Sequence, residues 1–416
     1  MSTIRVSPRR LLLVLSSLLI AYHPAQALTE TVLYSFTGVS DGKIPSGLLA
    51  DASGTLYGTT QTGGASGFGT VFSLPPSGQM TVLHDFRGGA DGAAPSLRAS
   101  LIRDSAGNLY GTTILGGASN HGTVFEITAG GSEKILYSFT GPTDGANPQA
   151  GLVQDAKGNF YGTTLAGGAF GAGTVFKLTQ AGKEQVLYSF TGGADGAAPV
   201  APLVLDALGN LYGSASLGGG FYKHCPQRGC GVIFKITPAG TEKVLWQFLK
   251  FDYGVSPQAP VLLDANGNVF GTTFTGGPSG YGLLFMITPA GQQVWLHYFR
   301  DHNLTGDGGY PIGPFVQDAK GNFYGVTYKG GTHNQGTVFM CTPNHVETVL
   351  YNFTGASDGG LPQSGLAADA QGNYYGTTLS GGAFGKGTIF KLTAQKLTTQ
   401  KLTTQNHHPM SARVLR

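Results

Sequence analysis

Hydrophobic and polar positions along most of this chain form short runs with a period of two, which is the period of β-strands. One stretch shows the plan, because it contains four such runs separated by glycine-rich turns, at residues 151–155, 159–164, 174–179 and 185–190. Runs of the helix formers Glu, Lys and Leu are nearly absent. The pattern therefore predicts an all-β protein.

The second of these runs recurs seven times along the chain. Successive copies lie 51 to 58 residues apart, and each contains an aromatic residue followed by glycine, at Tyr57, Tyr110, Tyr161, Tyr212, Phe270, Tyr324 and Tyr375. Four-stranded propeller blades produce repeats of roughly 40 to 50 residues. We therefore predict a seven-bladed β-propeller of four-stranded antiparallel blades.

The two ends of the repeat array are complementary. Residues 31–36 have the pattern of a fourth strand with no first three before it, and residues 388–393 that of a third strand with no fourth after it. Pairing of the two segments would complete the last blade and remove the exposed edges of an open array. We predict that the N-terminal strand pairs with the last repeat and closes the ring, so that the propeller comprises residues 28–394.

The segments outside the repeats predict an exported protein. Residues 1–27 combine a basic start, an apolar run at 11–21 and a small-x-small site at 25–27, as in a secretory signal peptide. The run is shorter than the roughly 20 residues that span a bilayer, so an uncleaved membrane anchor is the less favoured interpretation of this segment. Residues 395–416 are polar and basic, and we expect a disordered tail. The expected location is secreted, periplasmic or at the cell surface, without membrane insertion.

Composition narrows the class of protein further. Glycine accounts for 68 of 416 residues, and charged residues for 11% where about 25% is usual. The net charge of +3 is too small and dispersed to indicate a nucleic-acid partner. An aspartate also ends the first run of every unit and predicts a hairpin turn rather than a ring of carboxylates, at Asp51, Asp104, Asp155, Asp206, Asp264, Asp318 and Asp369.

Two of the three cysteines predict a disulfide. Cys225 and Cys230 lie in an insertion that lengthens the fourth repeat interval, and close cysteines in a loop of an exported protein usually pair with each other. A zinc site would need more ligands at tighter spacing. Cys341 has no partner in the sequence, and we expect a small buried core residue there.

Written out as Leu-Tyr-Ser-Phe-Thr-Gly, Asp-Gly, Asp-x-x-Gly-Asn, Tyr-Gly-Thr-Thr, Gly-Gly and Gly-Thr-Val-Phe-Lys-Leu, the repeat resembles that of the GloVer-type tandem-repeat proteins. These bacterial exported proteins are often described as "choice-of-anchor", because different members end in different C-terminal sorting segments. The resemblance covers residues 29–393 and implies a surface or secreted β-propeller, but it brings no activity or catalytic residues. The tail departs from the family pattern, because it has no apolar anchor helix or sortase-type motif, which puts attachment to the cell surface in doubt.

One face of the predicted propeller collects the variable loops. Strands of a blade alternate in direction, so the second-to-third loops and the blade-to-blade connections emerge together, and loops on a rigid scaffold usually carry function. We therefore expect any ligand site on this loop face, among Asp41, Asp91, Asp144, Asp195, Asp307, Asp358, His121, Tyr222, His224, His302 and His333.

Each of these candidates also has a structural explanation. The aspartates before glycine could bind calcium, but calcium needs six to eight oxygens and each loop offers one carboxylate. Turn formation is the favoured explanation, and no metal site is predicted. The histidines occupy non-equivalent loop positions, which suits either one asymmetric site or solvated tips. The repeated tyrosines favour packing over a sugar-stacking platform.

The sequence contains no His-Glu-x-x-His motif and no P-loop. It favours a monomeric, non-enzymatic scaffold that binds a glycan or a protein outside the cell. One alternative is an extracellular polysaccharide hydrolase or lyase with its site on the irregular loops of blades 4 to 6. A purely structural role in the envelope is the other.

Overall fold

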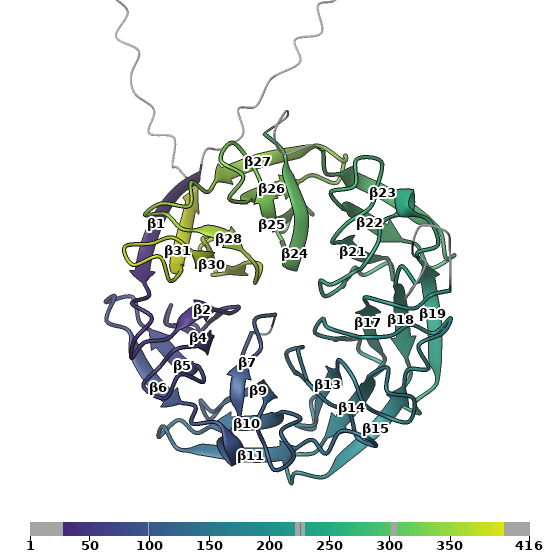
Figure 1. Ribbon diagram of the computed structural model, residues 1–416. Coiled ribbons are helices and arrows are strands. Elements are labelled where there is room, and N and C mark those ends of the chain that lie inside the picture. Colours follow the sequence, from purple (N-terminus) through teal and green to yellow (C-terminus); the bar gives the residue numbers. More distant parts are fainter. Residues whose placement is uncertain (1–27, 99, 221–224, 226–228, 301–305, 395–416) are drawn as a thin grey trace, which may run out of the picture.

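The computed structural model describes residues 28–394 except 99, 221–224, 226–228 and 301–305, and shows a ring of seven antiparallel sheets around a central axis (Figure 1). The predicted signal peptide and tail lie outside the described residues. The prediction of an all-β, seven-bladed propeller is confirmed. Two short 3-10 turns, η1 (Gly89–Asp91) and η2 (Phe251–Tyr253), lie in connections between blades.

Blades 3 to 6 each contain four strands in sequence order from the axis outwards. Their bounds are β12 (Val153–Gln154), β13 (Phe160–Thr164), β14 (Thr174–Leu178) and β15 (Glu184–Ser189); β16 (Val204–Leu205), β17 (Leu211–Ala215), β18 (Val232–Ile236) and β19 (Glu242–Gln247); β20 (Leu262–Leu263), β21 (Val269–Thr273), β22 (Leu283–Ile287) and β23 (Gln293–Tyr298); and β24 (Gly308–Gln317), β25 (Phe323–Gly330), β26 (Thr337–Cys341) and β27 (Glu347–Asn352).

In blades 1, 2 and 7 the innermost position is divided between two short strands that pair with the same neighbour. Blade 1 has β2 (Lys43–Pro45), β3 (Leu49–Ala50), β4 (Leu56–Thr62), β5 (Thr70–Leu74) and β6 (Thr81–Asp85); blade 2 has β7 (Ala93–Pro95), β8 (Ile102–Arg103), β9 (Leu109–Leu115), β10 (Thr123–Ile127) and β11 (Glu133–Ser138); blade 7 has β28 (Gly360–Pro362), β29 (Ala367–Ala368), β30 (Tyr374–Ser380), β31 (Thr388–Ala394) and β1 (Leu28–Ser35).

The first strand of the chain closes the ring. β1 is the outermost strand of blade 7 and pairs antiparallel with β31, from Leu28 opposite Ala394 to Ser35 opposite Thr388. In Figure 1 the purple N-terminal strand lies beside the yellow C-terminal one. The predicted closure is confirmed, and each of the seven described sheets has its outermost strand.

A pair of buried phenylalanines fills each seam, by which we mean the contact between two neighbouring blades. One member follows the fourth strand of a blade, and the other lies in the third strand of the next blade. The rings meet edge to face with centroids 5.0 to 5.4 Å apart, a geometry that aromatic pairs favour. The seven pairs are Phe36–Phe72, Phe86–Phe125, Phe139–Phe176, Phe190–Phe234, Phe248–Phe285, Phe299–Phe339 and Phe353–Phe390.

These phenylalanines explain the glycine of the repeated aromatic–Gly pair. A Cβ at Gly162 would lie 2.7 Å from Cζ of Phe176, and the six equivalent glycines are equally close to their own phenylalanine, at 2.4 to 2.8 Å. Real Cβ atoms essentially never come so close. The glycine is therefore required by close packing inside the blade and not by a turn.

The aspartate at the end of the first strand closes a hairpin, as predicted. Asp155 accepts hydrogen bonds from the backbone N–H groups of Lys157 and Asn159, the Asn159 side-chain amide and the Tyr161 hydroxyl, at 2.8 to 3.0 Å. This network saturates the carboxylate and also holds the repeated tyrosine in place.

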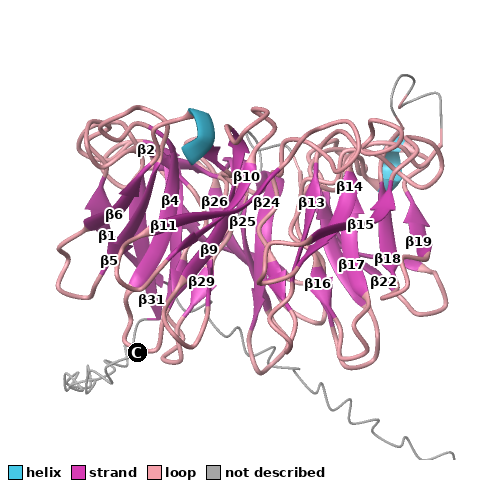
Figure 2. Ribbon diagram, turned by 90° about the horizontal axis from the view of Figure 1, so that it is seen from below, coloured by secondary structure: helices cyan, strands magenta, loops and turns pink. Residues whose placement is uncertain are grey.

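The loops divide between two faces of the ring. In Figure 2 the tight hairpins lie at one end of the blades, and the long loops and both 3-10 turns at the other. Backbone bonds tie the second-to-third loops to the blade connections, for example from Gly117 N–H to the Gly89 carbonyl at 2.8 Å. Within the described residues no helix is long and apolar enough to cross a membrane.

Candidate functional site

The predicted loop aspartates lie in the connections between blades, where their own loops hold them. Asp144 accepts hydrogen bonds from the Thr140 hydroxyl (2.7 Å), the backbone N–H groups of Thr140 and Gly141, and the Tyr137 hydroxyl of β11 (2.8 Å). Burial raises the pKa of Asp144, but the hydrogen bonds from Thr140 and Tyr137 outweigh it, so that the pKa is lowered. The carboxylate is therefore held charged at neutral pH.

The six aspartates do not meet one another, because each lies in a different seam. Asp41, Asp195 and Asp358 repeat the arrangement of Asp144, with a tyrosine from the preceding strand. Asp91 and Asp307 instead face a histidine, His84 or His297. The structure thus supplies one carboxylate per connection and no convergent cluster of these six residues.

A glutamate of the next blade faces five of these aspartates. Glu184, at the start of β15, has its pKa raised to about 7 by burial and, secondarily, by Asp144. Burial and the facing aspartate likewise raise the pKa of Glu30, Glu133 and Glu242 to about 7 and that of Glu347 to about 8. Perturbed carboxylates often mark active sites, but recurrence at five seams fits a repeated packing feature.

The sequence reasoning missed these glutamates although a signal was present. Each precedes the seam phenylalanine by six positions, as Glu30 precedes Phe36. Glu30 also shows why the partner was not foreseen, because it faces Asp358 only through closure of the ring.

Three kinds of side chain occupy the seam position two residues before the phenylalanine. Four seams have tyrosine there (Tyr34, Tyr137, Tyr188 and Tyr351), two have histidine (His84 and His297), and one has Trp246. We call these the tyrosine, histidine and tryptophan seams.

The tryptophan seam, between blades 4 and 5, has no acid at the two positions where other seams have aspartate and glutamate. Tyr253 stands where the other connections have aspartate, and Gln293 stands where five seams have glutamate. Trp246 and Tyr253 line a cavity of about 470 Å³. With Gln293 and the 37% exposed Trp295 they also line an adjoining cavity of about 430 Å³. Trp295 Nε1 donates a hydrogen bond to the side-chain Oε1 of Gln293 at 3.3 Å, and the ring centroids of Trp295 and Tyr253 lie 6.0 Å apart. Both tryptophans of the chain therefore line one groove.

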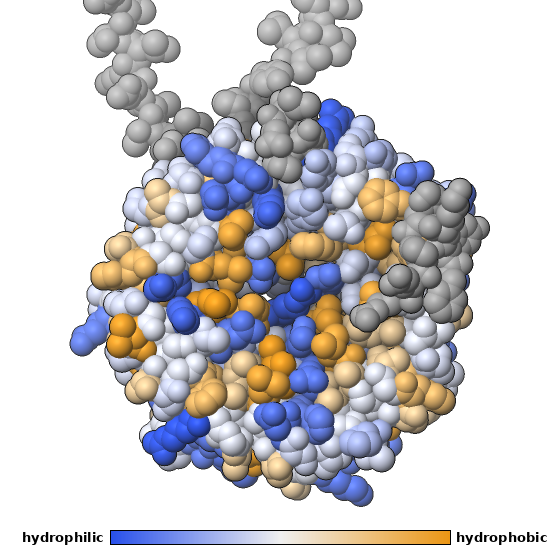
Figure 3. All heavy atoms as spheres, in the orientation of Figure 1, coloured by the Kyte–Doolittle hydropathy of each residue, from blue (hydrophilic) through white to orange (hydrophobic). Residues whose placement is uncertain are grey.

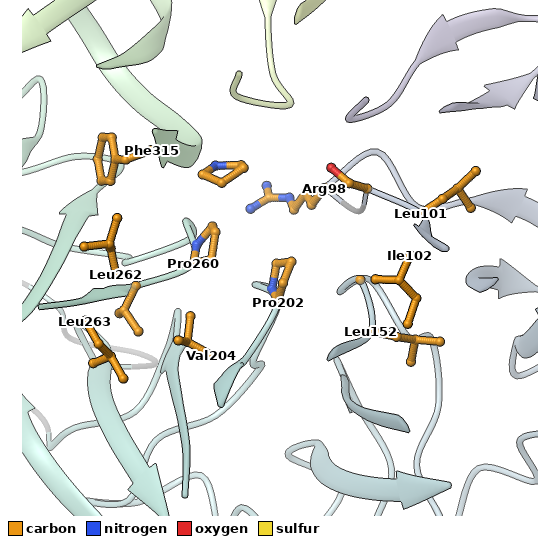
Figure 4. Close-up of a pocket in the computed structure, with 14 residues that line it drawn as sticks. Arg98, Leu101, Ile102, Leu152, Pro202, Val204, Pro260, Leu262, Leu263 and Phe315 are labelled. Carbon is orange, nitrogen blue, oxygen red and sulfur yellow. The ribbon is translucent and has the colours of Figure 1, made fainter. Parts of the chain in front are cut away.

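A second cavity, of about 400 Å³, lies on the ring axis between the innermost strands of blades 2 to 6. Its walls are mainly apolar, and Arg98 is the single charged residue among those that line it. Figure 4 shows the Arg98 side chain reaching into the space bordered by Pro202, Pro260 and Phe315. Seen down the axis, hydrophilic and hydrophobic residues alternate around the centre of the ring (Figure 3).

Arg98 is half-buried, and it forms no ion pair with any residue that the structure describes. Its Nη1 has no hydrogen-bond partner within the described part of the chain, and burial lowers the pKa of the guanidinium to about 10. The sequence reasoning missed this residue. The sequence nevertheless contains a signal, because the segment that holds Arg98 is longer than its counterpart in blade 3. Leu101 follows Pro95 by six positions, whereas Leu152 follows Pro148 by four.

The other predicted loop residues stay apart. His121 packs against the connection at Gly141, and His333 is exposed and bonded to the Thr332 hydroxyl at 2.9 Å. Tyr222, His224 and His302 lie outside the described residues. The structure brings no two of the described histidines into one site on the loop face.

The cysteines are placed as predicted. Cys225 and Cys230 form a disulfide in the second-to-third loop of blade 4, and both are buried beside Ile233 and Phe248. Cys341 is a free, buried thiol in β26.

The profile of the Gloeobacter/Verrucomicrobia repeat matches residues 16–225 and 221–413, which together cover nearly the whole chain. The chain belongs to the Gloeobacter/Verrucomicrobia repeat family. The resemblance inferred from the repeat motif is confirmed. A comparison with curated proteins finds no match.

Two solved structures resemble this family member at low sequence identity. One is the extracellular domain of a proposed one-component system, BT4673 from B. thetaiotaomicron, with a TM-score of 0.55 and 10% identity over 88% of this chain. The chain spans 40% of that structure's length. Another is a proposed gluconolactonase, with a TM-score of 0.41 and 11% identity over 88% of this chain and 91% of that one. At 10% identity the likeness to the first structure concerns the fold alone.

Proposed function

We propose that this protein is an exported binding module whose axial cavity holds the carboxylate end of an apolar ligand such as a peptide C-terminus. The observation that carries the proposal is Arg98, which points into an apolar cavity with no counter-ion on the wall. A buried charge without a partner is costly, by about 3–5 kcal/mol where a partner has been removed. A ligand carboxylate would supply that partner through charge-assisted hydrogen bonds.

The cavity also restricts the group attached to the carboxylate. A volume of about 400 Å³ is at the small end of ligand pockets, and prolines, leucines and Phe315 form most of its wall. Such a wall suits one apolar side chain and leaves the hydroxyl groups of a sugar without partners. The ring scaffold favours a rigid, preformed site, since every blade is fixed by its neighbours.

The test uses fluorescence polarisation with labelled peptides that end in leucine. Peptides with a free carboxylate should bind, and the same peptides with a C-terminal amide should not. R98Q should weaken binding by about 30-fold or more, because loss of one partner of a buried charge pair costs 2–5 kcal/mol. Without ligand, R98Q should melt at the same temperature or higher, since an uncompensated charge is removed. Equal binding of acid and amide peptides would contradict the proposal.

A second candidate activity, glycan binding, rests on the tryptophan seam. Trp246, Tyr253 and Trp295 offer aromatic faces, and Gln293 adds an amide, a combination of apolar surface and a few polar groups that suits sugar rings. Both tryptophans line this groove, so intrinsic fluorescence reports its occupancy alone. A glycan array with and without calcium would find candidate ligands. W295A should then weaken binding about tenfold, while F384A, which removes another exposed aromatic, should not.

A polysaccharide hydrolase or lyase would need an acid–base pair beside the sugar. Among the described residues that line the axial cavity and the groove there is no carboxylate and no imidazole, which favours binding over catalysis at these two places. Shortened glycans after incubation would reverse that preference.

The disulfide supports export, because disulfides persist in oxidising compartments. Closure of the ring supports a monomer, which light scattering would test.

A further inference from the structure

The two histidine seams bring together three metal-ligating groups from two blades. In the seam between blades 1 and 2, His84 Nε2 lies 3.1 Å from Asp91 Oδ1, and a Glu133 oxygen completes a set whose ligand atoms lie within 4.8 Å of one another. The seam between blades 5 and 6 repeats the set with His297, Asp307 and Glu347, and the first two are 3.3 Å apart. In each set the histidine and aspartate belong to one blade and its connection, and the glutamate to the next blade.

A second sequence change accompanies the histidine in both seams. In a tyrosine seam, the threonine after the phenylalanine donates its hydroxyl to the aspartate, as Thr140 does to Asp144 Oδ1. In both histidine seams an arginine, Arg87 or Arg300, replaces this threonine and bonds the aspartate through its backbone N–H. At Asp91 the backbone bond goes to Oδ2, so that Oδ1 faces the imidazole. The same two replacements occur together twice in one chain.

The glutamate completes the set. Glu133 Oε1 and Glu347 Oε1 are buried and have no hydrogen-bond partner among the described residues. Such an acceptor needs a donor or a cation. The glutamates of the tyrosine seams also have a buried Oε1 without a hydrogen-bond partner among the described residues. In those seams a proton bound between the glutamate and the facing aspartate would satisfy both carboxyl groups. Within the part of the chain that the structure describes, the histidine seams alone add a nitrogen ligand to the two carboxylates.

We propose that each histidine seam binds one divalent transition-metal ion, such as Zn²⁺, through the histidine Nε2 and the carboxylates of the facing aspartate and glutamate. Zinc bonds to nitrogen and oxygen of roughly 2.0–2.2 Å place neighbouring ligand atoms about 3–3.5 Å apart, which is the separation of both His–Asp pairs. Two carboxylates neutralise the ion. Calcium prefers six to eight oxygens and is the poorer match.

The sites are reachable from solvent and join two blades. The side chains of His84 and Asp91 are 15% and 19% exposed, and those of His297 and Asp307 are 16% and 9% exposed. Three protein ligands leave a coordination position for water, as in open zinc sites. Because the ligands come from two blades, a bound ion would clamp the seam and stabilise the folded ring by mass action.

The experiment is calorimetric titration of the chelator-treated, purified protein with Zn²⁺, Co²⁺ and Ca²⁺, together with metal analysis after dialysis. We expect two Zn²⁺ per chain, binding at least tenfold tighter than Ca²⁺, and a melting temperature that rises with zinc. The matched variants are H84Y and H297Y, which install the tyrosine of the other seams. Each should lose one zinc, and the double variant should lose both. E133Q should also lose one, whereas E184Q in a tyrosine seam should lose none.

Two controls keep the proposal falsifiable. If a tyrosine variant does not fold by circular dichroism, the visible absorption of Co²⁺ in the unaltered protein must show nitrogen and oxygen ligation at two sites. Zinc held only by histidines elsewhere would persist in the folded H84Y/H297Y variant. Unchanged stoichiometry in that variant, or no zinc binding by the unaltered protein, would overturn the proposal.

Discussion

The seam between blades 2 and 3 and the seam between blades 4 and 5 share a buried layer and differ in the layer beside it. Both contain a phenylalanine pair, at 5.1 Å in the first and 5.3 Å in the second. Next to that pair, the first seam sets Asp144 against Glu184, whereas the second has an open groove lined by four uncharged side chains, those of Trp246, Tyr253, Gln293 and Trp295. The buried layer therefore specifies the propeller, and the outer layer can change its chemistry one seam at a time.

The largest effect should come from removing the strand that completes blade 7. Deletion of residues 28–37 removes the pairing of β1 with β31 and the buried Phe36. About four to six ladder hydrogen bonds at roughly 1 kcal/mol each, plus the lost burial, should lower the free energy of unfolding by several kcal/mol. Urea denaturation measures this, with removal of residues 395–416 as the neutral control. An unchanged midpoint in the first variant would contradict closure by pairing.

The next largest effect tests whether the buried layer is the same in chemically different seams. Phe139→Ala and Phe248→Ala should each cost about 3–5 kcal/mol, the range for a buried phenylalanine. The two costs should agree although one seam is acidic and the other aromatic. Denaturant titration of both variants checks this, and a cost in only one of the seams would show that the outer layer also carries the fold.

A smaller effect, on the pH dependence of stability, should distinguish the outer layer of the acidic seam from that of the tryptophan seam. Glu184 faces Asp144 and Tyr137, and its pKa is raised to about 7 from an ordinary value near 4.5. The folded state therefore holds this proton more tightly than the unfolded chain does. Its contribution to stability is full below pH 4.5 and is lost as the pH rises through 7.

E184Q removes that dependence. Relative to the unaltered protein, E184Q should gain stability between pH 4.5 and 7 and match it at pH 4, as melting temperatures across this range would show. Gln293 already occupies the equivalent place in the tryptophan seam, so Q293A should shift stability equally at every pH. A pH profile unchanged by E184Q would mean that the acid pair does not titrate in this window.

The fold could be predicted from the sequence because its causes are local and repeated. Strand period, turn residues such as Asp155 and the phase of the two ends are all visible along the chain. The seam chemistry was not predicted, because its partners lie on different blades: Asp144 and Glu184 meet across a seam, and Glu30 meets Asp358 only in the closed ring. Arg98 could not be predicted from the repeat for another reason, because it lies in a longer spacing that blade 2 does not share with the other blades.

We expect the outer layer of a seam to determine which ligand that seam binds. The direct test is to convert a tyrosine seam into a histidine seam with Y137H/T140R, which leaves Asp144 and Glu184 in place. The zinc stoichiometry of the folded protein should rise from two to three, and it should stay at two when E184Q is added. A stoichiometry of two in the Y137H/T140R variant itself would contradict the claim.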